Sequence, residues 1–97
     1  MGLLEGRVAV ITGAGRGLGR EHALLFAAEG ASVVVNDLGQ EAQDVVDEIA
    51  AAGGAGVAST HDITSWEGGK ALIDLAVHEL GGLDVLVELF FDVSQDE

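Results

Sequence analysis

The feature that most constrains the fold is an apolar stretch that runs directly into a series of glycines. Residues 7–12 read RVAVIT, and Gly13, Gly15, Gly17 and Gly19 follow within seven positions, as an amphipathic helical pattern begins. A strand that turns at once into a helix leaves several backbone N–H groups unpaired at the positive end of the helix dipole. Because glycine leaves those groups uncovered, the turn suits an anionic ligand such as a pyrophosphate.

Four short apolar runs recur along the chain at intervals of 24 to 28 residues. They occupy residues 7–12, 31–37, 55–60 and 83–88. Each run is continuous rather than alternating, which is typical of strands covered on both faces. The segments between them carry apolar residues at helical spacing and end in glycine, the residue that most readily closes a helix.

Strands that alternate with helices predict a parallel sheet joined by right-handed crossovers. We therefore expect an α/β fold with one parallel sheet of four strands and three crossover helices. The chain of 97 residues is expected to form one domain over residues 1–97, in which residues 88–97 are a divergent acidic tail.

The second apolar run ends in Asn36 and Asp37, and Asp37 stands 24 residues after Gly13. A carboxylate at this place accepts hydrogen bonds from the hydroxyls of a ribose and repels a 2′-phosphate. Arg16, beside the glycines, opposes that repulsion. The balance favours NAD over NADP as the ligand.

The glycine spacing is T-G-x-x-x-G-x-G, because Leu18 stands where the pattern G-x-G-x-x-G would place its last glycine. The stretch TGAGRGLGREHALLFAAEGASVVVNDLG, followed by VVDEI, HDIT and GGLDVLV, resembles the short-chain dehydrogenase/reductase family. The similarity covers residues 3–87 and is strongest to the branch that includes the dehydrogenase units of peroxisomal multifunctional enzymes and their bacterial relatives.

This resemblance implies which residues bind the cofactor. The glycine loop would hold the pyrophosphate, Asp37 the adenosine ribose, and Asp62 with Ile63 the adenine. The candidate cofactor-binding residues are Gly13, Gly15, Arg16, Gly17, Leu18, Gly19, Asp37, Leu38, Asp62 and Ile63.

The chain departs from the family where the chemistry would occur. It has no tyrosine, and its only lysine is Lys70, so the family's Ser, Tyr and Lys are not present as a set and no catalytic residue is expected. The family continues its fourth strand into Asn-Asn-Ala-Gly, whereas Glu88 follows here. We expect an NAD-binding half of a truncated or engineered dehydrogenase, inactive alone because acid–base assistance is worth about 10² to 10⁴ in rate.

Two other interpretations remain open at this stage. The chain could be a fragment of an NAD-dependent oxidoreductase that acts on a secondary alcohol or a hydroxyacyl substrate. It could also be a self-associating scaffold that binds no ligand.

Charge and composition exclude several classes of partner. Seventeen Asp and Glu against four Lys and Arg give a net charge of −13, which disfavours nucleic acid and membrane surfaces. The chain has no cysteine, and His22, His61 and His78 fall on different elements, so we expect no metal site. Without a signal peptide or a run of bilayer length, a cytoplasmic location is expected.

The resemblance implies a Rossmann-like parallel sheet of four strands in the order 3-2-1-4, in which the first two crossover helices cover one face and the third lies alone on the other. This topology leaves one sheet face with a single helix and the fourth strand with an unpaired edge. Both features favour a homodimer or higher oligomer that forms through the fourth strand, the bare face and the tail. Leu89, Phe90 and Phe91 are the apolar residues of that tail. We also expect Trp66 to be a packing group rather than a stacking platform.

Overall fold

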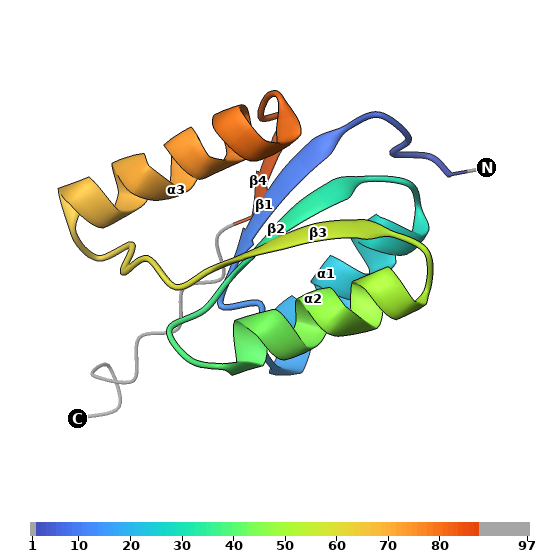
Figure 1. The fold of residues 1–97 in the computed structure, drawn as a ribbon, viewed down its shortest axis with the longest axis horizontal. Helices are drawn as coiled ribbons and strands as arrows, with labels where there is room; N and C mark the ends of the chain where they lie inside the picture. Colours follow the sequence, from blue (N-terminus) through green and yellow to red (C-terminus); the bar gives the residue numbers. More distant parts are fainter. Residues whose placement is uncertain (1, 88–97) are drawn as a thin grey trace.

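The computed structural model describes residues 2–87, in which four strands alternate with three helices (Figure 1). The elements are β1 (Val8–Thr12), α1 (Gly17–Ala28), β2 (Ser32–Asn36), α2 (Glu41–Ala51), β3 (Ala55–Ser59), α3 (Trp66–Leu80) and β4 (Val85–Val87). The predicted α/β alternation of a Rossmann-like fold is confirmed. The expected acidic tail at residues 88–97 lies outside the described residues.

All strands of the sheet are parallel, and their order is β3-β2-β1-β4, the order that the sequence favoured. Ile11 of β1 lies in register with Val35 of β2 on one side and with Val87 of β4 on the other. The chain proceeds outward from β1 to β2 and β3, and then returns past β1 to form β4. In open α/β sheets such a reversal marks the crevice at the carboxyl ends of the strands where ligands bind, and here it falls at the end of β1.

The helices divide between the two faces of the sheet as the sequence predicted: α1 and α2 lie on one side and α3 on the other (Figure 1). The α1/α2 face is the buried cluster of Ala9, Ile11, Ala14, Ala23, Ala31, Val33, Val35, Ala42, Val45 and Ile49. The α3 face is the buried cluster of Val8, Val10, Val34, Leu72 and Ala76. Alternate residues of β1 and β2 point to opposite faces, so each continuous apolar run serves both clusters.

Side-chain and backbone caps fix the ends of α3. The hydroxyl of Ser65 accepts a hydrogen bond from the amide of Gly68 at 2.9 Å, which satisfies one of the free donors at the start of the helix. Gly81 ends the helix with φ of 87°, a left-handed conformation that other residues adopt only with strain. None of the described helices has the length and apolar character needed to cross a membrane.

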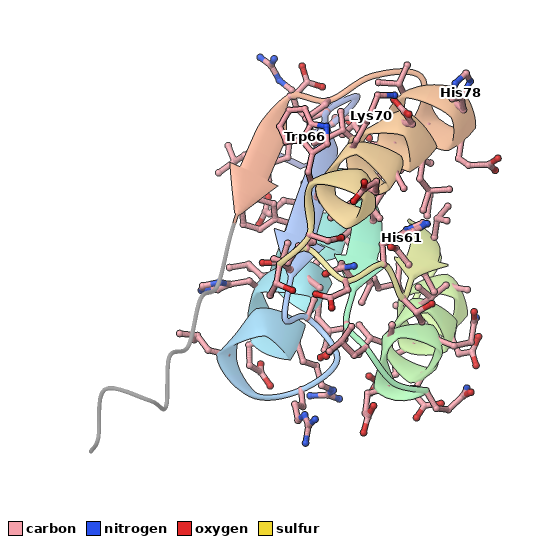
Figure 2. The ribbon with its side chains drawn as sticks, turned by 90° about the vertical axis from the view of Figure 1, so that its left-hand side faces the viewer. His61, Trp66, Lys70 and His78 are labelled. Carbon is pink, nitrogen blue, oxygen red and sulfur yellow. The ribbon has the colours of Figure 1, made fainter. Side chains whose placement is uncertain are left out.

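The expectation that Trp66 is a packing group is wrong. Its side chain is 82% exposed, at the first residue of α3. The helix meets the sheet through Leu72 and Ala76, whereas Trp66 lies on a flank shared with Ile73, two turns further along. Figure 2 shows Trp66 and Lys70 projecting together from this part of α3.

Candidate functional site

The glycine loop connects β1 to α1 at the crevice. Gly13 and Gly17 have φ of 63° and 61°, the left-handed conformation that allows the chain to reverse between strand and helix. The amide of Ala14 donates to the carbonyl of Asn36 at 2.9 Å, and Ala14 itself is fully buried. The start of the loop is therefore anchored to the end of β2.

Asp37 reaches the glycine loop directly. Its Oδ2 accepts a hydrogen bond from the amide of Gly15 at 2.9 Å, and its Oδ1 accepts one from the amide of Leu38 at 2.8 Å. A Cβ atom on Gly15 would lie 2.7 Å from Asp37 Oδ2 and 2.6 Å from the Cβ of Glu41. Gly15 is therefore needed for the close approach of these side chains, and its amide orients Asp37.

The start of α1 is open toward the same crevice. Arg16 is the N-cap residue, with extended backbone and no side-chain hydrogen bond to the helix, and the first turn contains no acidic residue. The amides of Gly17, Leu18 and Gly19 lie in the first turn, where a helix offers its N–H groups no carbonyl. Gly19 is buried, whereas Leu18 is 66% exposed. This geometry, together with the helix dipole, can receive an anion.

The segment after β3 contains Asp62 and Ile63. Asp62 Oδ1 accepts hydrogen bonds from the hydroxyl of Thr64 at 2.6 Å and from its amide at 2.9 Å. These two hydrogen bonds, that of the hydroxyl first, lower the pKa of Asp62, although its carboxyl is exposed. Ile63 packs against the α3-face cluster. The two residues therefore form a tight turn that leads into α3.

A buried polar network that sequence reasoning missed holds this turn to β2. Asn36, 3% exposed, donates from Nδ2 to Ser59 Oγ at 3.1 Å and to the carbonyl of His61 at 3.0 Å. Ser59 Oγ also accepts from the amide of His61 at 3.2 Å, and it lies 2.8 Å from His61 Nδ1. Since a hydroxyl has two acceptor sites and one donor, the Ser59 hydrogen is left for Nδ1. The only sequence signal was a polar Asn36 that ends an otherwise apolar strand.

A hollow of about 630 Å³ lies beside the turn, between β1 and α3. Its lining residues are Thr12, Ile63, Thr64, Ser65, Trp66, Gly69, Lys70, Leu72, Ile73 and Asp74. Most of the lining is apolar, and the charge of Lys70 is paired with Asp74, since Nζ lies 3.0 Å from Oδ2. Figure 2 shows His61, which precedes the turn, on the segment that leads toward α3.

The structure brings some of the candidate residues together and leaves others apart. Gly15 and Asp37 are hydrogen-bonded, and Leu38 follows with 68% of its surface exposed. Asp62 and Ile63 follow the end of β3, the strand that pairs with β2. Arg16 is exposed and forms no ion pair with any residue in the range 2–87. In that range, no three potential metal ligands gather at one place.

The comparisons with known proteins agree on one family. Residues 7–88 match the short chain dehydrogenase family. The chain is 54% identical over 93 residues to peroxisomal multifunctional enzyme type 2 of Drosophila melanogaster, covering 86% of this chain and 15% of that protein. It is 51% identical over 85 residues to 7α-hydroxysteroid dehydrogenase of Escherichia coli K12, covering 87% of this chain and 33% of the relative.

Solved structures agree with this result. A short chain dehydrogenase from Mycobacterium avium superposes with a TM-score of 0.92 at 50% identity, over 95% of this chain and 36% of that one. A 7α-hydroxysteroid dehydrogenase complexed with NADH and 7-oxo glycochenodeoxycholic acid superposes with a TM-score of 0.84 at 50% identity, over 86% and 33%. The chain thus spans about a third of the length of these dehydrogenases and less of the multifunctional enzyme. It belongs to the short-chain dehydrogenase family and corresponds to the N-terminal portion of its relatives.

Proposed function

We propose that the chain binds NAD, chiefly through the adenosine and pyrophosphate half of the cofactor. The observation that carries the proposal is the contact between Asp37 and the glycine loop, where Oδ2 accepts the Gly15 amide at 2.9 Å beside the open start of α1. The free amides at the start of the helix can donate hydrogen bonds to a diphosphate, and the carboxylate beside them can accept hydrogen bonds from the neighbouring ribose. The complex of 7α-hydroxysteroid dehydrogenase with NADH supports the same ligand class.

The candidate residues then take distinct roles. The amides of Gly17, Leu18 and Gly19 bind the pyrophosphate, and Gly13 provides the turn that presents them. Gly15 acts differently, because its amide is bound to Asp37 and so positions the carboxylate for the ribose. Arg16 and Leu38 border the pyrophosphate and the ribose, and Asp62 and Ile63 border the adenine.

We propose that the chain alone does not transfer hydride. It contains no tyrosine, and its only lysine, Lys70, pairs with Asp74 on α3 at 3.0 Å. Within residues 2–87, the chain therefore offers no tyrosine and lysine pair to exchange a proton with a carbonyl oxygen as hydride moves. If the chain is part of a longer oxidoreductase for secondary alcohols or hydroxyacyl compounds, other residues must supply that proton.

Calorimetric titration with NAD, ADP-ribose, AMP and NADP tests the binding proposal. ADP-ribose should bind nearly as tightly as NAD, because the proposed contacts stop short of the nicotinamide, and NADP should bind more weakly. Absence of heat with every nucleotide would contradict the proposal and favour the scaffold interpretation. NADH formation from an alcohol by this chain would contradict the claim that it is not catalytic alone.

A matched pair of glycine substitutions separates lost binding from lost folding. Gly17 and Gly53 have φ of 61° and 89°, and a Cβ atom on either would meet nothing within 4 Å. Gly17→Val and Gly53→Val therefore introduce similar backbone strain, but only Gly17 lies at the proposed pyrophosphate position. Gly17→Val should abolish NAD binding and Gly53→Val should retain it; the alanine pair serves if either valine variant fails to fold. Equal affinity in both variants would contradict the assignment.

We also propose that the chain self-associates. In the described sheet β4 pairs with β1 alone, and the hollow of about 630 Å³ opens beside α3. An unpaired edge and an apolar hollow are both surfaces that a second copy can cover. Light scattering at micromolar concentration should give at least twice the chain mass, and Ile73→Lys should reduce it. A measured mass equal to that of a single chain would contradict self-association. The cytoplasmic location stays a prediction.

A further inference from the structure

We propose that Glu41 is a second specificity-determining residue, which rejects the 2′-phosphate of NADP by its charge. The inference rests on the proposed NAD binding, and it assigns a role to a residue outside the candidate site. Glu41 is the first residue of α2 and follows Asp37 by one short turn. It thus lies on the ribose side of the crevice, where NAD and NADP differ.

The packing around Gly15 brings Glu41 next to Asp37. A Cβ atom on Gly15 would lie 2.6 Å from Glu41 Cβ and 2.7 Å from Asp37 Oδ2, so both side chains contact the same point of the loop. A Cβ atom on Gly39 would overlap the carboxylate oxygen Oε1 of Glu41. The Glu41 side chain therefore folds back over the turn between Asp37 and α2 and does not extend away from it.

The two carboxylates differ in how far their charge is compensated. Both oxygens of Asp37 accept backbone amides, from Gly15 and Leu38. The Glu41 carboxylate accepts no hydrogen bond and forms no ion pair within residues 2–87. Arg16 pairs with neither acid in this part of the chain. Glu41 therefore presents the less compensated negative charge to any phosphate placed on the 2′-oxygen.

The start of α2 gives this charge a specific effect. Gln40, the N-cap residue, makes no side-chain capping bond, so the positive end of the helix dipole is not covered by it. Such an end favours an anion. Two acids stand in the first turn, Glu41 and Asp44, and Asp44 accepts a hydrogen bond from Gln40 Nε2 at 3.5 Å. In the described part of the chain, Glu41 adds an unpaired charge at the first residue of the helix and so weakens the attraction that a 2′-phosphate would find there.

The test compares the affinities for NAD and NADP of the parent chain, Glu41→Gln and Glu79→Gln. Glutamine keeps the shape of Glu41 and removes its charge. Glu79, exposed near the far end of α3, undergoes the same change in net charge away from the crevice. Glu41→Gln should raise NADP affinity on the order of tenfold, the effect of removing one unit charge several ångströms from a phosphate, with little change for NAD. Glu79→Gln should change neither, and the gain should shrink as salt screens the charge.

The outcomes distinguish this inference from the proposed function. NAD binding with an unchanged NADP to NAD ratio in Glu41→Gln would overturn the role of Glu41 alone. A gain for NADP in Glu41→Ala that Glu41→Gln does not share would show steric exclusion and would also overturn the electrostatic role. If the parent chain binds no NAD, both the proposed function and this inference are wrong.

Discussion

The two faces of the sheet are built from the same strands and yet are packed differently. Among the described residues, the α1/α2 face contains ten buried apolar residues against five on the α3 face. Arg20 of α1 donates from Nε to Glu48 Oε1 of α2 at 3.0 Å. That hydrogen bond raises the pKa of Arg20. The α3 face has the hollow of about 630 Å³. Strands with continuous apolar runs can be covered on both sides, but the number of helices on each side decides how completely they are.

This difference extends to the candidate site, which takes parts from both faces. The glycine loop and Asp37 belong to the closely packed side, where Ala14 is fully buried and Gly15 has no room for a side chain. Asp62 and Ile63 belong to the α3 side, next to the hollow. We therefore expect the pyrophosphate and ribose contacts to be held more rigidly than the adenine contacts.

The largest effect should come from truncating one buried helix residue on each face. Ile49 of α2 and Leu72 of α3 are 1% and 2% exposed, and each packs toward the sheet. Ile49→Ala should lower the free energy of unfolding by about 3 to 4 kcal/mol, because the cavity left behind is enclosed. In a chain diluted until it is monomeric, Leu72→Ala should cost about 2 to 3 kcal/mol, because its cavity merges with the hollow and is open to water.

Urea denaturation of both variants measures the comparison. Val77→Ala, at a residue that is 47% exposed on α3, is the control for truncation in a partly solvated position. At concentrations where the chain self-associates, the loss for Leu72→Ala should rise, because the second copy covers the hollow. A larger loss for Leu72→Ala than for Ile49→Ala in the monomer would contradict an open hollow.

Gly15→Ala should have the next largest effect and should act at the closely packed side of the site. The added methyl group would lie 2.6 Å from Glu41 Cβ and 2.7 Å from Asp37 Oδ2, too close for either contact to persist. We expect a loss of about 1 to 3 kcal/mol in unfolding free energy, as for other overpacked positions. NAD affinity should also fall, since Asp37 must move from its place beside the loop; calorimetry before and after the substitution measures it. An unchanged affinity for NAD would mean that Asp37 does not bind the ribose.

Much of the fold and the outline of the site follow from the sequence, because they depend on rules of spacing and topology. Apolar runs alternating with helical patterns fix a parallel sheet, and the carboxyl ends of parallel strands meet at one edge, so Asp37 had to approach the glycine loop. Side-chain hydrogen bonds follow no such spacing rule. The pairing of Asn36 with Ser59, and the use of the Gly15 amide by Asp37, depend on individual rotamers and distances. Trp66 was misjudged because a large apolar residue predicts burial only when a neighbouring element covers it.

Two adjacent glycines of α3 give opposite effects on the open face, and the gain expected at Gly69 is smaller than the loss expected at Gly15. A Cβ atom on Gly69, which lines the hollow, would meet nothing within 4 Å, whereas one on Gly68 would overlap the carbonyl oxygen of Asp62. Gly69→Ala should stabilise the chain by about 0.5 to 1 kcal/mol through helix propensity. Gly68→Ala should destabilise it and disturb the Ser65 cap. Thermal denaturation of the diluted, monomeric chain compares the two variants, and destabilisation by Gly69→Ala under these conditions would contradict an open hollow.

The smallest effect concerns the pKa of Asp62 at the turn into α3. The Thr64 hydroxyl donates to Asp62 Oδ1 at 2.6 Å and is the main cause of the lowered pKa. Thr64→Val removes this donor but keeps the amide, so the pKa should rise toward the usual value of about 3.9. A carboxyl whose pKa is lower in the folded chain than in the unfolded chain stabilises the fold at pH values above its unfolded pKa. This stabilisation is lost as the pH falls through the pKa of the folded chain. The variant should therefore lose less stability than the parent as the pH falls through and below the unfolded pKa of about 3.9. Carbon-13 NMR titration of the Asp62 carboxyl measures the shift directly, and Thr60→Val, at an exposed position on the same segment, should leave it unchanged. If the pKa of Asp62 in Thr64→Val equals that of the parent, the amide of Thr64 and not its hydroxyl holds the carboxylate. Backbone donors alone would then hold Asp62 at the turn beside the hollow, as they hold Asp37 on the closely packed side.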